Sequence, residues 1–201
     1  MFYEPKKGLP FDIDPFKSLI FPRPIGWISS VNKKGVANLA PYSYFNSVTD
    51  EPPQIMFCSN GGSSNYKYKD SLSNILSTKE FVVNFATSST RNQMNNSSKD
   101  FKPEEDEFVL SKLKKKKSKL VRAPSVKESP VNLECTLVKK IKLNSNSNKI
   151  STMIIGEVIG IFINDKFIKN NRVDSVSMSY IARMGYSEYT TVTSKFNLKR
   201  K

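Results

Sequence analysis

The residues best suited to binding chemistry lie in one polar and aromatic stretch, at positions 38–47. This stretch is too polar for a hydrophobic core and too aromatic for an ordinary surface loop. Small hydroxyls and an amide beside flat rings suit the wall of a pocket for a planar ligand that forms hydrogen bonds. We therefore expect a loop here whose Ser43, Asn46 and Ser47 line such a pocket.

A second candidate site lies at Lys69, Asp70 and Ser71, directly before an apolar pattern of helical spacing. The apolar positions of this predicted helix are Leu72, Ile75 and Leu76. Asp70 or Ser71 can cap its N-terminus. Unsatisfied backbone N–H groups, the helix dipole and the Lys69 ammonium would all favour a bound phosphate there. The alternative is an ordinary helix cap beside an exposed lysine, and the residue pattern alone favours that alternative.

The elements around these two sites are predicted to be mainly short β-strands. Apolar, β-branched and aromatic residues predict strands over 24–31, 54–59, 80–86, 131–138 and 150–163. A polar loop that closes on Gly35 follows the first strand, and Gly156 and Gly160 indicate bends or close backbone approaches in the last. This pattern predicts a mainly β (α+β) fold, an antiparallel barrel with a few peripheral helices rather than a βαβ fold. The sequence contains no GxGxxG or Walker motif, which argues against a Rossmann or P-loop nucleotide site.

Less regular segments connect these strands. Residues 1–17 form a proline-containing lead, and residues 18–21 begin a strand that the following prolines bend. We expect loops or turns over 60–68, 144–148 and 164–174, a surface helix over 87–99 and a short helix over 175–182. Residues 100–125 carry an acidic and then a basic block, which is typical of a solvated excursion that the apolar residues 108–110 could attach to the core. We interpret the whole chain, 1–201, as one domain.

The histidine and cysteine content excludes several kinds of site. The chain has no histidine, so His-based triads and His-ligated metals are excluded. Its two cysteines, Cys58 and Cys135, lie in separate apolar runs, where buried free thiols are expected. No apolar run is long enough to span a bilayer, and residues 1–10 lack an apolar signal segment. We expect a cytoplasmic protein with no membrane partner.

The net charge of +14 raises the question of a nucleic-acid partner. The lysines at 114–117 and the basic tail at 199–201 could contact phosphate backbones. However, Lys, Asn, Ser and Ile are abundant throughout the chain, and no recognition motif accompanies the charge. We therefore do not expect nucleic-acid binding, although a positive surface would attract anionic nucleotides.

The sequence resembles the flavin reductase-like proteins with the FMN-binding split β-barrel, a family that includes the flavoredoxins. The first matching segments are RPIGWIS at 23–29, GVANLAPYS at 35–43, and Phe45-Asn46 followed by Pro52-Pro53. Further matches are Lys69-Asp70-Ser71 with Asn74-Ile75, the run 80–84, Glu128-Ser129-Pro130 with Leu133-Glu134, and the run 156–158. These segments follow the family's order over about residues 17–190. The family commonly has Arg-x-Gly-Gly where this chain has residues 183–186, so Tyr186 replaces a glycine.

The resemblance implies a homodimer that binds FMN near the subunit interface and takes electrons from NADH or NADPH. It implies that the flavin ring lies at Ser43, Asn46 and Ser47. It also implies that Ser29 and Ser30 face the ribityl chain or phosphate, and that Lys69, Asp70 and Ser71 lie near the phosphate. Arg23 is either a solvated edge residue or a neighbour of the cofactor.

Three functions remain open from the sequence. The first is a flavin reductase that transfers a hydride from the nicotinamide to flavin N5, a reaction in which the cofactor carries the chemistry and no catalytic acid or base is needed. The second is a non-enzymatic FMN-binding electron-transfer protein of the flavoredoxin type, with the same pocket. The third, and the most remote, is a basic barrel that binds nucleic acid.

Overall fold

The computed structural model describes residues 1–61, 68–102, 104–145 and 150–199. The predicted loop at 60–68 and the predicted turn at 144–148 fall largely outside these residues, as does the end of the basic tail. Among the described residues, no helix is long and apolar enough to cross a membrane.

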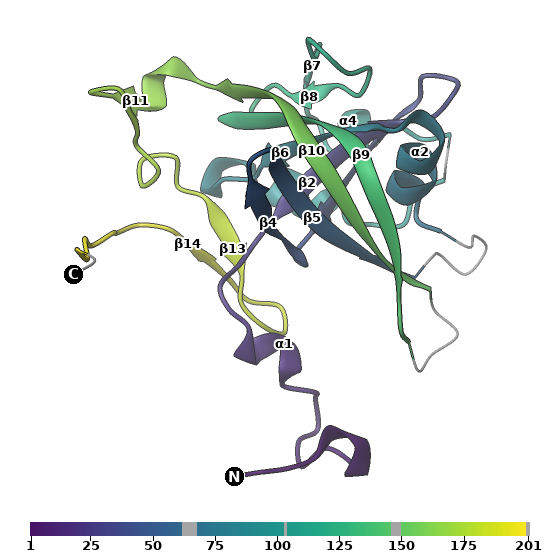
Figure 1. The fold of residues 1–201 in the computed structure, drawn as a ribbon, viewed down its shortest axis with the longest axis vertical. Helices are drawn as coiled ribbons and strands as arrows, with labels where there is room; N and C mark the ends of the chain where they lie inside the picture. The colour runs from purple at the N-terminus through teal and green to yellow at the C-terminus, as the bar shows by residue number, and fades with distance from the viewer. Residues whose placement is uncertain (62–67, 103, 146–149, 200–201) are drawn as a thin grey trace.

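Seven antiparallel strands form the main sheet, in the order β3-β2-β6-β9-β10-β5-β4 (Figure 1). They are β2 (Gly26–Val31), β3 (Ala37–Tyr42), β4 (Phe45–Asp50), β5 (Pro53–Asn60), β6 (Glu80–Phe85), β9 (Val131–Leu143) and β10 (Ser151–Ile163). The predicted strands are therefore confirmed, with longer bounds for β9. The predicted loop over 38–47 is wrong, because this stretch forms nearly all of β3 and the first half of β4, with only Ser43 and Tyr44 between them.

The sheet rolls up because its two edge strands, β3 and β4, are joined by those two residues. The Cys58 N–H donates to the Tyr44 carbonyl oxygen at 2.8 Å, and the ring centroids of Tyr42 and Phe57 lie 4.8 Å apart. These contacts hold the edge strand β3 and the turn after it against β5, the neighbour of the other edge strand. The enclosed core contains Phe57, Phe81, Ile28 and Ile154, all fully buried.

Close packing explains one of the two glycines in β10. A Cβ added at Gly156 would lie 2.3 Å from Cζ of Phe81, so the backbone must approach that ring without a side chain. The register between β9 and β10 also shifts beside both Gly156 and Gly160. The predicted bends and close approach in this strand are therefore confirmed.

The helices are short and peripheral, as predicted. They are α1 (Phe16–Leu19), α2 (Asp70–Thr78), α3 (Arg91–Asn96) and α4 (Glu107–Leu110), with 3-10 turns η1 (Pro5–Lys7), η2 (Ser88–Thr90) and η3 (Asp165–Phe167). Helix α2 buries Leu72 and Ile75 against the barrel core. The prediction that Asp70 or Ser71 caps it is wrong, since Lys69 occupies the N-cap position without a side-chain cap.

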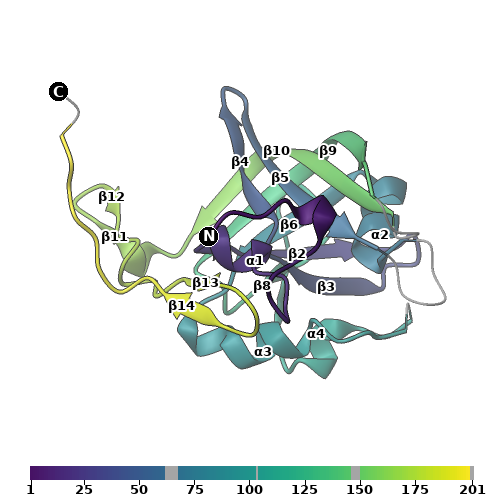
Figure 2. The same cartoon turned by 90° about the horizontal axis from the view of Figure 1, so that it is seen from below.

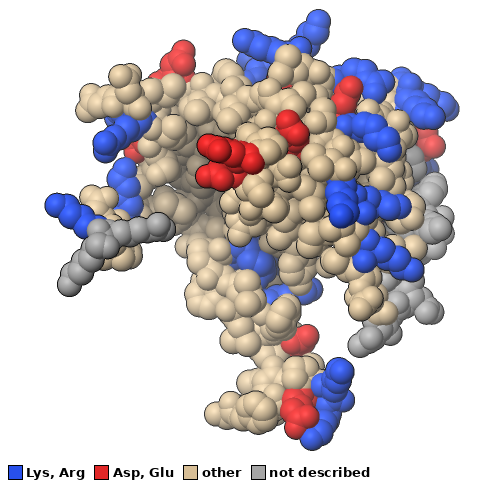
Figure 3. Space-filling model, viewed as in Figure 1, with Lys and Arg blue, Asp and Glu red and all other residues tan. Residues whose placement is uncertain are grey.

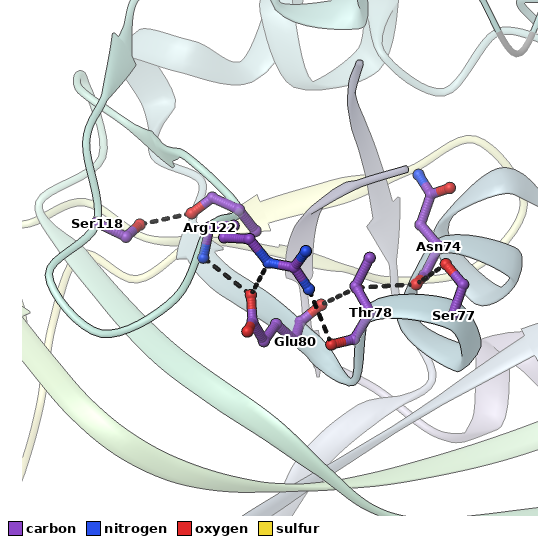
Figure 4. A network of polar contacts seen from close by, with 7 residues as sticks. Asn74, Ser77, Thr78, Glu80, Ser118 and Arg122 are labelled. Carbon is purple, nitrogen blue, oxygen red and sulfur yellow. Dashed lines mark hydrogen bonds and ion pairs between the residues drawn. The ribbon is translucent and has the colours of Figure 1, made fainter. Parts of the chain in front are cut away.

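Polar contacts tie the end of α2 to the start of β6 and to the segment before β8 (Ser125–Val126) (Figure 4). Thr78 Oγ1 donates to the Glu80 carbonyl at 3.4 Å, and Arg122 Nε donates to Glu80 Oε2 at 3.1 Å. The Glu134 carboxylate accepts the backbone N–H groups of Lys119 and Leu120. These bonds attach part of the charged segment 100–125 to the barrel.

The rest of that segment agrees only in part with the prediction of a solvated excursion. Phe108 is fully buried and does attach the segment to the core, whereas Val109 and Leu110 are exposed. Strands β7 (Lys115–Lys116) and β8 (Ser125–Val126) pair as a small ribbon. Lys and Arg side chains gather over the top and right of the molecule in Figure 3, where Figure 1 places β7 and α2.

The C-terminal region differs most from the prediction. Strands β1 (Arg23–Pro24), β13 (Ile181–Arg183) and β14 (Tyr189–Thr191) form a second sheet, and β11 (Ile168–Lys169) pairs with β12 (Arg172–Val173). The predicted helix over 175–182 is wrong: turns lead directly into β13, and Ser179 has a φ of +52°. The predicted strand over 18–21 is wrong too, because residues 16–19 form α1. The pairing of β13 with β1 and β14 overrides the weak helix preference of 175–182, and the prolines at 22 and 24 disfavour strand pairing beside 18–21.

Two segments project from the barrel. Figures 1 and 2 show the N-terminal lead on one side of the body and the C-terminal segment, with β11 and β12, on another. The lead and the residues that follow it up to position 21 leave many large apolar side chains exposed, at Phe2, Leu9, Phe11, Ile13, Phe16, Leu19, Ile20 and Phe21. Cys135 is buried as expected, whereas Cys58 is only half-buried, and both are free thiols.

Candidate functional site

A cavity of about 620 Å³ lies between α1, α3, the turn joining β3 to β4, and the β13–β14 hairpin. We call it the large cavity. Its wall includes Arg23, Ser43, Met94, Arg183 and Tyr186. Ser43 is therefore at a cavity, as predicted, because it belongs to the short turn at the open end of the rolled sheet.

A second cavity, of about 80 Å³, lies at the N-terminus of α2, and we call it the small cavity. All three residues of the second predicted site, Lys69, Asp70 and Ser71, line it. Pro41 of β3 and Ser98 line both cavities, so the two cavities adjoin each other at the outer edge of β3. The structure thus brings Ser43 and the start of α2 into one site.

The floor of the small cavity is a chain of polar side chains. Ser71 Oγ donates to Asn38 Oδ1 at 2.6 Å, and Asn38 Nδ2 donates to Glu107 Oε1 at 2.5 Å. The Leu39 N–H donates to Glu107 Oε2 at 3.2 Å. Polar residues are accommodated in β3 because α2 and α4 supply these partners, which fixes Ser71 in one orientation.

Glu107 is a buried carboxyl group at this floor. Burial raises its pKa to about 7, and the charge of Asp70 acts in the same direction, while the hydrogen bonds from Asn38 and Leu39 oppose the rise. Burial also raises the pKa of Asp70, with added repulsion from Glu104 and Asp100. The small cavity therefore holds carboxyl groups beside Lys69 and Lys99, rather than cations alone.

Tyr42 presents an unsatisfied hydroxyl at the wall of the small cavity. The residue is 6% exposed, and its hydroxyl forms no hydrogen bond within the described part of the chain. Burial raises the pKa of Tyr42, opposed by the nearby hydroxyls of Ser71 and Ser59. A buried hydroxyl without a partner costs free energy, so this group is suited to a polar ligand.

Arg23 is a second buried polar group with an unsatisfied donor, at the wall of the large cavity. It is 7% exposed, its Nη1 donates to the carbonyl oxygens of Lys17 and Ile20, and its Nε has no hydrogen-bond partner among the described residues. No carboxylate pairs with it in the described ranges. Its interpretation as a solvated edge residue is therefore wrong. A buried cation without an anion is costly, which suits Arg23 to a ligand with negative charge or acceptor oxygens.

Ser29 and Ser30 do not reach either cavity. Both are fully buried in β2. Ser29 Oγ donates to the Pro124 carbonyl at 2.6 Å and accepts from Asn84 Nδ2 at 3.0 Å, while Ser30 Oγ accepts from Asn74 Nδ2 at 3.2 Å. Because β2 is covered on both faces, its hydroxyls join elements of the fold together. In this chain they support the site without lining it.

Asn46 and Ser47 also lie outside both cavities. They are exposed on the edge strand β4, where Asn46 Oδ1 accepts the Ser47 N–H at 2.9 Å. The prediction placed them beside Ser43 on a single loop. The strand instead carries them away from the turn.

Sequence reasoning missed most of the far wall of the large cavity. Arg183 contacts Tyr189 through its Nη1 and lies 4.5 Å from the centroid of that ring, while its Nη2 donates to the Tyr186 carbonyl. Met94 and Asn95 of α3 complete this wall. One feature of the sequence pointed to this wall: Tyr186 stands where the resembling family commonly has glycine. In the structure Tyr186 adopts a left-handed φ of +46°.

The comparisons with known proteins agree with this architecture. A family model described as "Flavin reductase like domain" matches residues 18–180. An uncharacterized protein of Aquifex aeolicus is 36% identical over 182 residues, which cover 90% of each chain. The structure of nitrilotriacetate monooxygenase component B from Bacillus cereus has a TM-score of 0.88 and 29% identity, and covers 98% of each chain. A Shewanella frigidimarina structure described as having a split barrel domain has a TM-score of 0.82 and 21% identity, covers 92% of this chain and 90% of its own, and supports the fold alone.

Proposed function

Because this chain belongs to the flavin reductase-like family, we propose that it is an FMN-binding oxidoreductase that takes electrons from NADH or NADPH. The family and the split barrel make it a flavin-related protein; the choice of FMN and of a nicotinamide donor is our proposal. The observation that carries it is the pair of adjoining cavities beside β3. The large cavity has the size of a ring system, and the small cavity lies at a helix N-terminus with a lysine.

The residues at both ends fit the chemical groups of FMN. At the small cavity, the first backbone N–H groups of α2, that of Ser71 among them, and the Lys69 ammonium favour a phosphate. The unpartnered Tyr42 hydroxyl is an additional donor there. At the large cavity, Ser43 and the buried Arg23 guanidinium provide donors for the carbonyl oxygens of a flavin ring.

The carboxyl groups of the small cavity limit how tightly a phosphate is held. Asp70 is the first residue of α2, so its carboxylate competes with a phosphate for the same helix N-terminus. Glu107 adds a second carboxyl group at the same floor. This competition favours a flavin that exchanges with solution rather than one held permanently.

The bound flavin would supply the hydride acceptor. The chain itself must therefore bind the flavin, orient its ring and shield the reacting face from water. Arg23 and Ser43 orient the ring, and Lys69 with Ser71 anchors the phosphate. Met94 and Ile25 give the large cavity an apolar wall that excludes water from the reacting face. In the proposed reaction no side chain of the described site acts as an acid or base.

We also propose that the protein is a homodimer. Strand β4 is an edge of the main sheet, and five of its six residues are exposed, Asn46 and Ser47 among them. The N-terminal lead beside the large cavity exposes apolar side chains that water solvates poorly. A second copy that covers these surfaces would bring Asn46 and Ser47 to the flavin site, in agreement with the expectation from the resemblance.

The proposal is tested by purifying the protein, denaturing it and identifying any released chromophore by mass. Oxidation of NADH and NADPH is then followed at added FMN, FAD and riboflavin. Flavin-dependent oxidation of either donor supports the reductase. Bound FMN without oxidation of either donor would select the electron-transfer alternative. Absence of flavin binding, with salt-dependent binding of nucleic acid, would overturn both.

A further inference from the structure

A third cavity, of about 610 Å³, adjoins the large cavity on the far side of Arg183 and Tyr189. Met94, Asn95, Arg183 and Tyr189 line both cavities, so they form a common wall. Each of these cavities has the volume that usually holds one small molecule. The proposed flavin ring accounts for the large cavity and leaves the third cavity without an occupant.

The third cavity is cationic. Arg91 and Arg183 line it, and no Asp or Glu is among the described residues at its wall. Neither arginine forms an ion pair in the described part of the chain. Arg91 Nη1 donates only to the Ser88 carbonyl, at 3.3 Å, and the Arg183 guanidinium contacts Tyr189 and the Tyr186 carbonyl. A guanidinium has five N–H donors, so both arginines retain donors for an anion.

The positions of the two arginines differ in a way that suits a ligand with two separate anionic groups. Arg183 lies at the boundary, because it lines the large and the third cavity. Arg91 lines only the third cavity, on the side away from the proposed flavin. The polar side chains of Asn92, Thr190 and Thr191 provide hydrogen-bonding groups between them.

We propose that the third cavity binds the adenylate half of the nicotinamide donor, with Arg183 on the pyrophosphate and Arg91 on a 2′-phosphate, so that NADPH is preferred over NADH. This inference rests on the proposed function. The nicotinamide must reach the flavin ring in the large cavity, which places the pyrophosphate at the common wall and the adenosine beyond it. Arginine is well matched to both anionic groups, since its planar fork binds phosphate through paired hydrogen bonds.

The first experiment compares donors in charge-removing variants. Arg91→Gln should lower kcat/KM for NADPH about ten- to hundredfold and change the value for NADH less than about twofold. Arg183→Gln should lower kcat/KM for both donors. The matched control is Arg122→Gln, since Arg122 pairs with Glu80 and lines none of these cavities. Equal losses with both donors in Arg91→Gln, or no loss with either, would overturn the assignment of Arg91.

The second experiment measures binding without turnover. Isothermal titration calorimetry with adenosine 2′,5′-bisphosphate should show binding to the flavin-loaded and to the flavin-free protein. Arg91→Gln should weaken this binding about tenfold or more and leave the binding of ADP unchanged. If the wild-type protein oxidises neither donor yet binds the bisphosphate through Arg91, the proposed function fails and the anion site stands. If the bisphosphate does not bind, or if Arg91→Gln weakens FAD binding instead, the third cavity is not a site for the donor.

Discussion

Glu107 couples the folded state to pH through one buried carboxyl group. Burial raises its pKa from 4.5 to about 7, so between these values the folded protein keeps a proton that the unfolded chain releases. The folded state binds more protons in this window, and stability therefore falls as pH rises from about 4.5 to 7. The difference corresponds to about 3 kcal/mol, because one pKa unit is worth about 1.4 kcal/mol.

Glu107→Gln should remove this dependence. We expect the free energy of unfolding of the wild-type protein to fall by about 2–3 kcal/mol more than that of the variant between pH 5 and pH 8. The amide cannot accept from both Asn38 and Leu39, so the variant should be less stable at pH 5. Urea denaturation across the pH range measures both effects. Parallel pH profiles for the two proteins would show that Glu107 does not titrate in this window.

Lys69 and Asp70 should affect FMN binding in opposite directions. Lys69→Ala should raise the dissociation constant of FMN about five- to tenfold, because it removes a cation at the helix N-terminus. Asp70→Asn should lower that constant, because it removes a competing carboxylate from the same place. Quenching of FMN fluorescence on binding measures all three proteins, and Lys34→Ala, in the exposed turn before β3, is the control. An unchanged constant in Lys69→Ala would remove Lys69 from the site.

At the scale of elements, the packing of β10 against β6 depends on a missing side chain. Gly156→Ala would place a Cβ 2.3 Å from the fully buried Phe81 ring. We expect a loss of about 2–3 kcal/mol in the free energy of unfolding, as for other overpacked cores. Gly160→Ala is the control, since its Cβ would lie 3.1 Å from the movable end of the Leu120 side chain and at an ordinary contact distance of 3.5 Å from Glu134 Cβ.

The same contact can be tested by a double-mutant cycle. Phe81→Leu shortens the ring that the new methyl group would meet, so the costs of Gly156→Ala and Phe81→Leu should not add. Chemical denaturation of the two single variants and the double variant gives the coupling energy. Additive losses would show that the two residues do not constrain each other.

The elements at the candidate site were the hardest to predict from local pattern. The stretch 38–47 reads as a loop because its alternation of apolar and polar residues is weak. It forms strand residues of β3 and β4 instead. The polar Asn38 is accommodated in β3 because it forms hydrogen bonds with Ser71 and Glu107, which are 33 and 69 residues away in the chain. The segment 175–182 similarly becomes turns and the start of β13, because pairing with β1 and β14 replaces the helix that its composition favours.

At the scale of the whole molecule, the proposed homodimer can be tested at the exposed apolar surface near the N-terminus. Leu19 is 65% exposed at the end of α1, and in the proposed homodimer a second copy would cover it. We expect Leu19→Asp to convert a dimer to a monomer in sedimentation experiments, because an interface cannot bury an unpaired carboxylate. Val109→Asp, at an equally exposed position on α4, should leave the mass unchanged. A wild-type protein that sediments as a monomer at every concentration would contradict the proposed dimer.

The sequence by itself determined the fold class, most of the strands and helix α2, and it singled out Ser43 and Lys69–Ser71, which line adjoining cavities in the structure. These features depend on short-range patterns and on motifs that keep their order along the chain. The tertiary structure alone decided that Ser29 and Ser30 are buried supports and that Arg23 lacks an anionic partner. It also decided that Arg91, Arg183 and Tyr189 surround cavities next to the site. The physical reason is that burial, pairing of charges and the shape of a cavity depend on which distant segments meet when the sheet rolls up, and no local spacing records that.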